Sequence, residues 1–73
     1  MNRRLLHITS VSKFCDLANR LNEEFSDKFV LQNSDGSKEI EINTTISIIY
    51  ALSEFDDIYL VNKTNDGVFP DFV

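Results

Sequence analysis

Residues 40–52 constrain the fold most, because a strand pattern gives way to a helix pattern within them. Glutamate and isoleucine alternate over residues 39–42, which is the period of a half-buried strand. Apolar residues then recur at helical spacing: Ile48, Ala51, Leu52 and Phe55. The polar step between the two patterns can cap the helix with Asn43, Thr44 or Thr45, whose side-chain oxygens can accept hydrogen bonds from its first turn. A strand followed directly by a helix is therefore predicted in the middle of the chain.

The same periodicities predict the order strand, helix, strand, strand, helix, strand. The first helix has the clearest pattern, with Ser10 or Ser12 as its cap and an apolar stripe of Phe14, Leu17, Ala18, Leu21 and Phe25. An Asp-Gly turn within residues 34–37 joins the second and third strands as a hairpin. The predicted strands cover residues 4–8, 29–33, 38–42 and 58–61, and the second helix covers residues 46–55.

This order predicts an α/β (α+β) fold in which two layers form an open-faced sandwich. Two helices with one apolar stripe each are expected on the same face of an antiparallel four-stranded sheet, because so small a chain offers little area for a second covered face. The expected shared core consists of Phe14, Leu17, Leu21, Ile40, Ile42, Leu52 and Leu60. With 73 residues, the chain is expected to be a single domain over residues 1–73.

The distribution of charge argues against a nucleic-acid-binding protein. The net charge is −5, no acidic residue precedes Asp16 and no basic residue follows Lys63, so a clustered cationic surface is not expected. No apolar run is long enough for a signal peptide or a membrane span. The single cysteine, Cys15, cannot form an internal disulfide and is expected to be a buried, reduced thiol. A cytoplasmic protein is therefore expected.

The residue types needed for catalysis or metal binding do not converge in this pattern. One histidine and one cysteine cannot form a structural zinc site. His7 alternates with Leu6 and Ile8 and is expected on the solvent face of the first strand. We therefore predict no enzyme activity, no metal and no cofactor.

The second helix carries more apolar residues than one core face needs. Ile46, Ile49 and Tyr50 lie on a second stripe of that helix. This stripe can be a docking surface for a partner protein, or it can be covered by residues 68–73, a tail in which Pro70 excludes a helix. The sequence leaves both readings open.

Three segments resemble the phosphocarrier protein HPr family of the bacterial sugar phosphotransferase system. They are residues 8–11 (Ile-Thr-Ser-Val), 14–21 (Phe-Cys-Asp-Leu-Ala-Asn-Arg-Leu) and 42–49 (Ile-Asn-Thr-Thr-Ile-Ser-Ile-Ile), and the likeness spans about residues 5–61. They are similar to the first strand-to-helix junction, the first helix and the start of the second helix of short, divergent members. The family's third, C-terminal helix has no counterpart here.

The resemblance implies which chemistry this chain has lost. The family's phosphorylatable histidine matches Ser10 and its arginine matches Ser12, so histidine phosphotransfer is not expected and the catalytic set is empty. The family's regulatory serine matches Thr44, or Thr45 with a shift of one residue, which makes these two the candidates for regulatory phosphorylation. Its apolar docking patch matches Thr45, Ile46 and Ile49, which overlap the surplus stripe.

We therefore expect a non-catalytic, HPr-like regulatory or adaptor protein that docks protein partners through Thr45, Ile46, Ile49 and Tyr50. A first alternative is an active phosphocarrier component of the phosphotransferase system that uses His7. A second is an unrelated small α/β interaction module that forms a homodimer through the sheet face of Leu5, Val30, Tyr59 and Val61.

Overall fold

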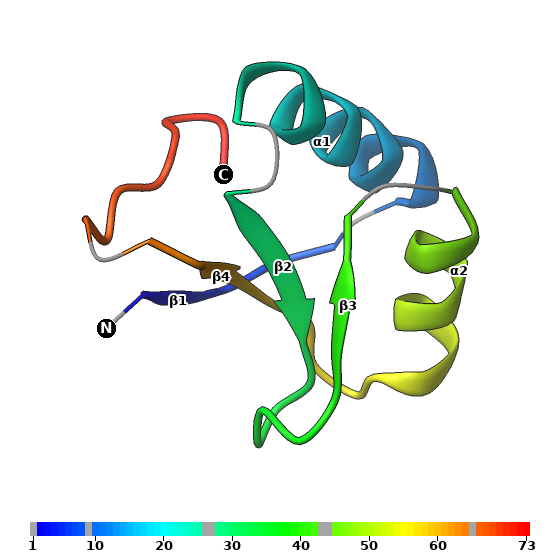
Figure 1. Cartoon of the computed structure of the whole chain (residues 1–73). Coiled ribbons are helices and arrows are strands. Elements are labelled where there is room, and N and C mark those ends of the chain that lie inside the picture. The colour runs from blue at the N-terminus through cyan, green and yellow to red at the C-terminus, as the bar shows by residue number, and fades with distance from the viewer. Residues whose placement is uncertain (1, 9, 26–27, 43–44, 65) are drawn as a thin grey trace.

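The computed structural model describes residues 2–8, 10–25, 28–42, 45–64 and 66–73. The elements follow in the order β1 (Arg3–Leu5), α1 (Val11–Glu24), β2 (Phe29–Gln32), β3 (Glu39–Glu41), α2 (Thr45–Glu54) and β4 (Tyr59–Asn62). Both helices cover the same face of the sheet (Figure 1). The predicted order, the two layers and the one-sided placement of the helices are confirmed.

The four strands form one antiparallel sheet in the order β1-β4-β2-β3. The last strand therefore lies between the first two, and Leu60 faces both Arg4 of β1 and Leu31 of β2 in the register. Leu31 and Leu60 are completely shielded from solvent. The centre of the sheet is thus built from segments far apart in the sequence, while β1 and β3 form its edges.

The core lies between the helices and the covered face of the sheet. Of the predicted core residues, Phe14, Leu21, Ile42 and Leu60 are buried, and Leu17, Ile40 and Leu52 are partly buried against the same cluster. Both helices contribute to one cluster with β2 and β4, because their apolar stripes face the same side of the sheet. The core assignment is confirmed.

The first strand begins and ends earlier than predicted. It covers Arg3–Leu5 instead of residues 4–8, although the Leu6 N–H still donates to the Ile58 carbonyl at 2.9 Å. Ile58 precedes the first residue of β4, so this bond lies outside the paired segments of the two strands. Ser10 caps α1 as predicted, since its Oγ accepts a hydrogen bond from the Lys13 N–H at 3.2 Å.

The hairpin between β2 and β3 is tied by the side chains of its turn. Asn33 Oδ1 accepts from the Lys38 N–H at 3.1 Å, and Asp35 Oδ1 accepts from the Ser37 N–H at 2.9 Å. Gly36 has a φ of 75°, the left-handed conformation that glycine adopts most easily. Because Asn33 and Lys38 already belong to this turn, both strands are shorter than predicted.

Residues 68–73 return over the core beside α1 (Figure 1). The ring of Phe69 lies 5.6 Å from that of Phe29, and the Arg4 guanidinium lies 4.7 Å from the centre of the Phe69 ring. The Arg20 guanidinium covers the Phe72 ring at 3.8 Å. The tail thus completes the core next to α1, where aromatic rings bury area and stack with arginine.

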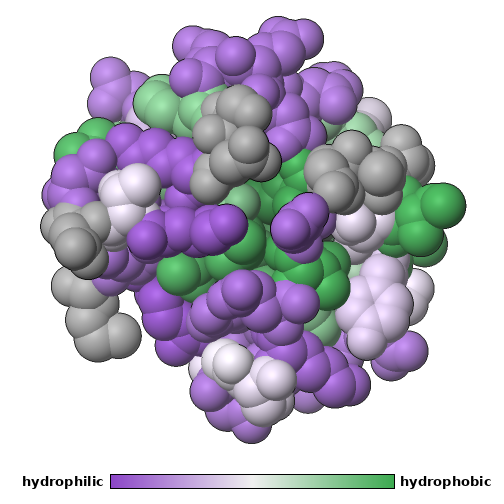
Figure 2. Space-filling model, viewed as in Figure 1, coloured by the Kyte–Doolittle hydropathy of each residue, from purple (hydrophilic) through white to green (hydrophobic). Residues whose placement is uncertain are grey.

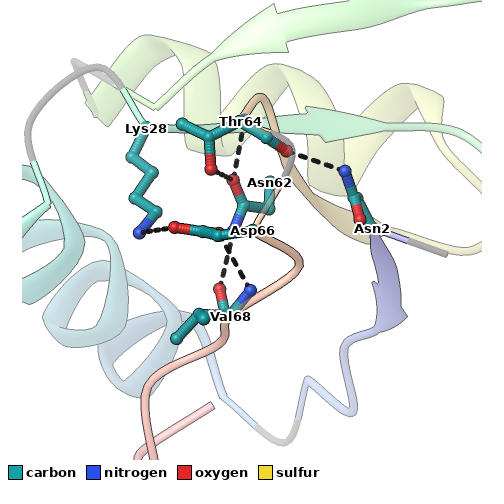
Figure 3. A network of polar contacts seen from close by, with 6 residues as sticks. All are labelled: Asn2, Lys28, Asn62, Thr64, Asp66 and Val68. Atoms are coloured by element: carbon teal, nitrogen blue, oxygen red, sulfur yellow. Dashed lines mark hydrogen bonds and ion pairs between the residues drawn. The ribbon is translucent and has the colours of Figure 1, made fainter.

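A buried polar residue at the end of β4 sets the direction of this tail (Figure 3). The Asn62 Nδ2 donates to Asp66 Oδ1 at 2.7 Å and to the Val68 carbonyl at 2.8 Å. Its Oδ1 accepts from the Thr64 N–H at 2.8 Å and from the Thr64 hydroxyl at 2.7 Å. All four hydrogen-bonding positions of the Asn62 amide are therefore used, which compensates its burial.

Asp66 connects this turn to β2. Its Oδ2 accepts from Lys28 Nζ at 2.8 Å, and its Oδ1 accepts from the Val68 N–H at 3.0 Å. The Lys28 ammonium, followed by the Val68 N–H, holds the pKa of the Asp66 carboxyl well below its ordinary value. We name the side chains of Asn62, Thr64, Asp66 and Lys28 the Asn62 network.

The core assignment predicts that Leu21→Ala lowers the free energy of unfolding by about 2–5 kcal/mol, because a large buried side chain leaves a cavity. Leu21 is 3% exposed. Urea unfolding followed by circular dichroism measures the change, and the exposed helical Asn19→Ala serves as a control. A loss below about 0.5 kcal/mol, the scale of surface substitutions, would contradict the core assignment.

The Asn62 network predicts a pH dependence of stability. Since the folded pKa of Asp66 lies below its unfolded value, the carboxylate stabilises the fold above the unfolded pKa and loses this contribution as the pH falls below about 4. Asp66→Asn should therefore be less stable than wild type at pH 7, with a difference that shrinks on acidification. The exposed Asp57→Asn is the control, and a difference for Asp66→Asn that stays constant from pH 7 to pH 3 would contradict this role.

Candidate docking surface on α2

Helix α2 carries apolar residues on two sides, and only one side faces the core. Ile48 and Ala51 are 4% and 0% exposed, whereas Ile46 and Ile49 are 79% and 53% exposed. Tyr50 is 41% exposed, and its ring meets that of Phe55 edge-on at 6.0 Å. We name Ile46, Ile49 and Tyr50 the α2 patch.

The position of the tail decides between two readings of this patch. Phe69 and Phe72 contact Phe29 and Arg20, beside α1, and leave Ile46 and Ile49 exposed. The reading in which residues 68–73 cover the two isoleucines is therefore wrong. Figure 2 shows hydrophobic surface protruding over α2 at the right-hand edge of the molecule.

The local sequence explains why the patch stays uncovered. α2 has ten residues and packs chiefly through Ile48, Ala51 and the adjacent Phe55, which occupy one side of the helix. Residues 46, 49 and 50 lie on the opposite side at three- and four-residue steps. A helix that is apolar on both sides needs a second covered face, and within the described residues α2 has its main contacts with α1 and β3.

The sequence that contains α2 carries charges of one sign. No lysine, arginine or histidine occurs between Lys38 and Lys63, a stretch that contains α2. Glu54, Asp56 and Asp57 at the end of α2 are exposed. The α2 patch is thus apolar and is followed along the chain by acidic residues, which favours a basic surface around the matching groove of a partner.

The candidates for regulatory phosphorylation lie at the start of α2. Thr45 is the first residue of the helix, and its side chain lies outside the described part of the structure. Thr44 lies outside the described residues, as does Asn43, the other proposed cap. Their roles stay predictions.

Residues 10 and 12 offer hydroxyls at the start of α1. Ser10 Oγ lies 3.4 Å from Ser12 Oγ and accepts from the Lys13 N–H, so it is engaged in capping the helix. His7 is exposed, as predicted, but it follows the end of β1 and is not a strand residue. Cys15 is a free thiol and is half-buried, which corrects the expectation of full burial: it lies beside the helix stripe that faces the core.

Sequence reasoning missed the role of Arg3 on the sheet face opposite the helices. Its guanidinium lies 4.2 Å from the centre of the Tyr59 ring, and its Nη2 donates to the Asn33 carbonyl at 2.9 Å. The side chain therefore crosses the face on which Leu5 and Val30 were expected to be available for dimerisation. Val30 is 2% exposed, and Figure 2 shows the hydrophobic surface over β2 framed by hydrophilic side chains.

Two further kinds of site concern metal ions and membranes, in the described part of the chain. It contains no group of three or more histidine, cysteine, aspartate or glutamate side chains arranged to hold a metal ion. None of its helices is long and apolar enough to cross a membrane.

Comparison of the chain with protein-family models, with characterised proteins and with solved structures finds no match.

Proposed function

We propose that this chain is a non-catalytic regulatory or adaptor protein of the cytoplasm, related to the HPr proteins of the sugar phosphotransferase system, and that it docks protein partners through α2. The observation that carries the proposal is the exposure of Ile46 and Ile49 on a helix whose opposite side already fills the core. Exposed apolar residues that gather on one surface often mark a contact site.

The element order and the one-sided placement of the helices, which the periodicities and the chain length predicted, support the relationship, since the resemblance rests on the same order of elements. The hydroxyls of Ser10 and Ser12 support the loss of phosphotransfer, because neither can take the place of an imidazole acceptor or of a guanidinium that stabilises the transferred group.

The partner that fits α2 has an apolar groove bordered by lysine or arginine. Ile46, Ile49 and Tyr50 would enter the groove, and Glu54 with Asp56 and Asp57 would meet its basic border. Phosphorylation of Thr44 or Thr45 would act as a switch. A phosphate at the start of a helix is favoured by the helix dipole, and it would place negative charge beside the apolar patch.

Docking through α2 predicts that Ile49→Asp removes a partner captured from the native host by wild-type protein. The substitution should change the free energy of unfolding by less than about 0.5 kcal/mol, because Ile49 is exposed. The matched control is Val11→Asp, which places the same charge at another exposed β-branched residue, 55% exposed, on α1. Loss of folding in Ile49→Asp would place this residue in the core, and an unchanged partner set would contradict docking through α2.

The loss of the histidine predicts that the chain stays unlabelled when it is incubated with the upstream phosphotransfer enzyme and radioactive phosphoenolpyruvate. An HPr protein of the same host is the positive control. Acid-labile phosphate on His7 would contradict the proposal and favour the active phosphocarrier, and His7→Ala would identify this site by removing the label.

A further inference from the structure

A groove of about 400 Å³ lies between β1, the first half of α1 and the tail. Its floor is apolar, with Leu6 and Phe14 buried and Ile8 and Leu17 partly buried. Phe72 of the tail forms one wall. The groove lies on the helix-covered side of the sheet, far in the sequence from α2, and does not include the α2 patch.

The charge of the groove is opposite to that of the whole chain. Arg4, His7 and Lys13 line it together with no acidic side chain, although the chain has a net charge of −5. Asp56 and Asp57 line an adjoining hollow that shares Leu5–Ile8 with the groove, so the basic part of the site is the part around Arg4 and Lys13. Arg4 stacks on Phe69, but neither Arg4 nor Lys13 forms an ion pair with any residue that the structure describes. The signal in the sequence was the absence of acidic residues before Asp16.

A free sheet edge runs along the groove. β1 is an edge strand, and Arg4 faces Leu60 of β4 in its register. The Leu6 N–H donates inward to Ile58. Since the backbone groups of alternate residues point to opposite sides of an antiparallel strand, those of Arg3 and Leu5 point away from β4. An extended segment beside β1 would gain main-chain hydrogen bonds there.

We propose that the edge of β1 and this groove bind an extended acidic segment of a partner protein that carries apolar side chains at alternate positions. The segment adds a strand to the sheet, and every second side chain enters the groove over Leu6 and Phe14. Its carboxylates pair with Arg4 and Lys13. A second copy of this chain fits poorly, because antiparallel pairing of two β1 strands would bring together the arginines of both copies.

This site does not depend on docking through α2. Its partner must be acidic, whereas the partner proposed for α2 must be basic around its groove, so the two sites select different proteins. A chain with both sites can bring two partners together.

Selection of a random peptide library displayed on phage against the immobilised full chain tests the site. The expected peptides are acidic with alternating apolar residues, and a selected peptide should shift the amide resonances of residues 4–8 and 10–17 in ¹⁵N-labelled protein. Lys13→Glu should weaken its binding by about tenfold or more, because an attractive charge becomes repulsive. Lys38→Glu, which changes another exposed lysine, in the hairpin, should leave the affinity unchanged.

Leu5→Pro tests the sheet edge separately. Proline is tolerated on an edge strand where its missing N–H faced outward, so the variant should fold and lose the peptide. Should it unfold, the comparison of Lys13→Glu with Lys38→Glu still decides.

The proposal is overturned by selected peptides without acidic residues, by resonance shifts confined to other surfaces, by equal effects of the two lysine variants, or by a library that yields no binder. It is also overturned if the free chain proves to be a dimer paired through β1.

Discussion

The pairing of β4 between β1 and β2 is the interaction on which the rest of the structure depends. Residues near the end of the chain thereby join β1 to β2. Within this pairing, Leu31 and Leu60 are completely shielded from solvent. Because β4 lies in the centre, the chain must cross the sheet twice, and both crossings place their helices on one face. Asn62 ends this strand, and its satisfied amide directs residues 66–73 back over the core beside α1.

These constraints place basic and apolar residues in one groove and leave a second apolar surface uncovered. The tail fills the space beside α1 and forms a wall of the groove that contains Arg4 and Lys13. α2 receives no such cover, so Ile46 and Ile49 stay exposed beside acidic residues. The proposed adaptor function rests on the exposed isoleucines of α2, since apolar contact provides affinity while nearby charge selects the partner.

Periodicity was sufficient to predict the elements, the covered face and the second apolar stripe of α2, but it left open whether the tail covers that stripe. The stripe of α1 and the alternation in β3 report which side of each element is buried, and α2 showed more apolar residues than one side requires. The predicted strand ends were less accurate than the predicted elements, because the end of β1 depends on how far β4 extends opposite Leu6.

No local sequence pattern predicted the polar contacts between distant residues. Asn62 looks like an ordinary residue at a strand end, and its burial follows from partners that only the folded turn brings together. The same is true of Arg3, which meets Tyr59 and Asn33 only after β1 has joined the sheet. The path of the tail was also open, because its sequence around Pro70 has neither the period of a strand nor that of a helix.

The central claim is that one side of α2 lies in the core and the other is exposed for binding a partner. Its most direct test is the paramagnetic broadening of methyl resonances by a soluble nitroxide. In protein with ¹³C-labelled isoleucine methyls, the account predicts strong broadening of Ile46 and Ile49 and little broadening of the internal controls Ile48 and Ile58, which are 4% and 5% exposed. Addition of a partner captured from the host should protect Ile46 and Ile49 selectively. Protection of these two methyls in the free protein, or unchanged broadening in the complex, would contradict the account.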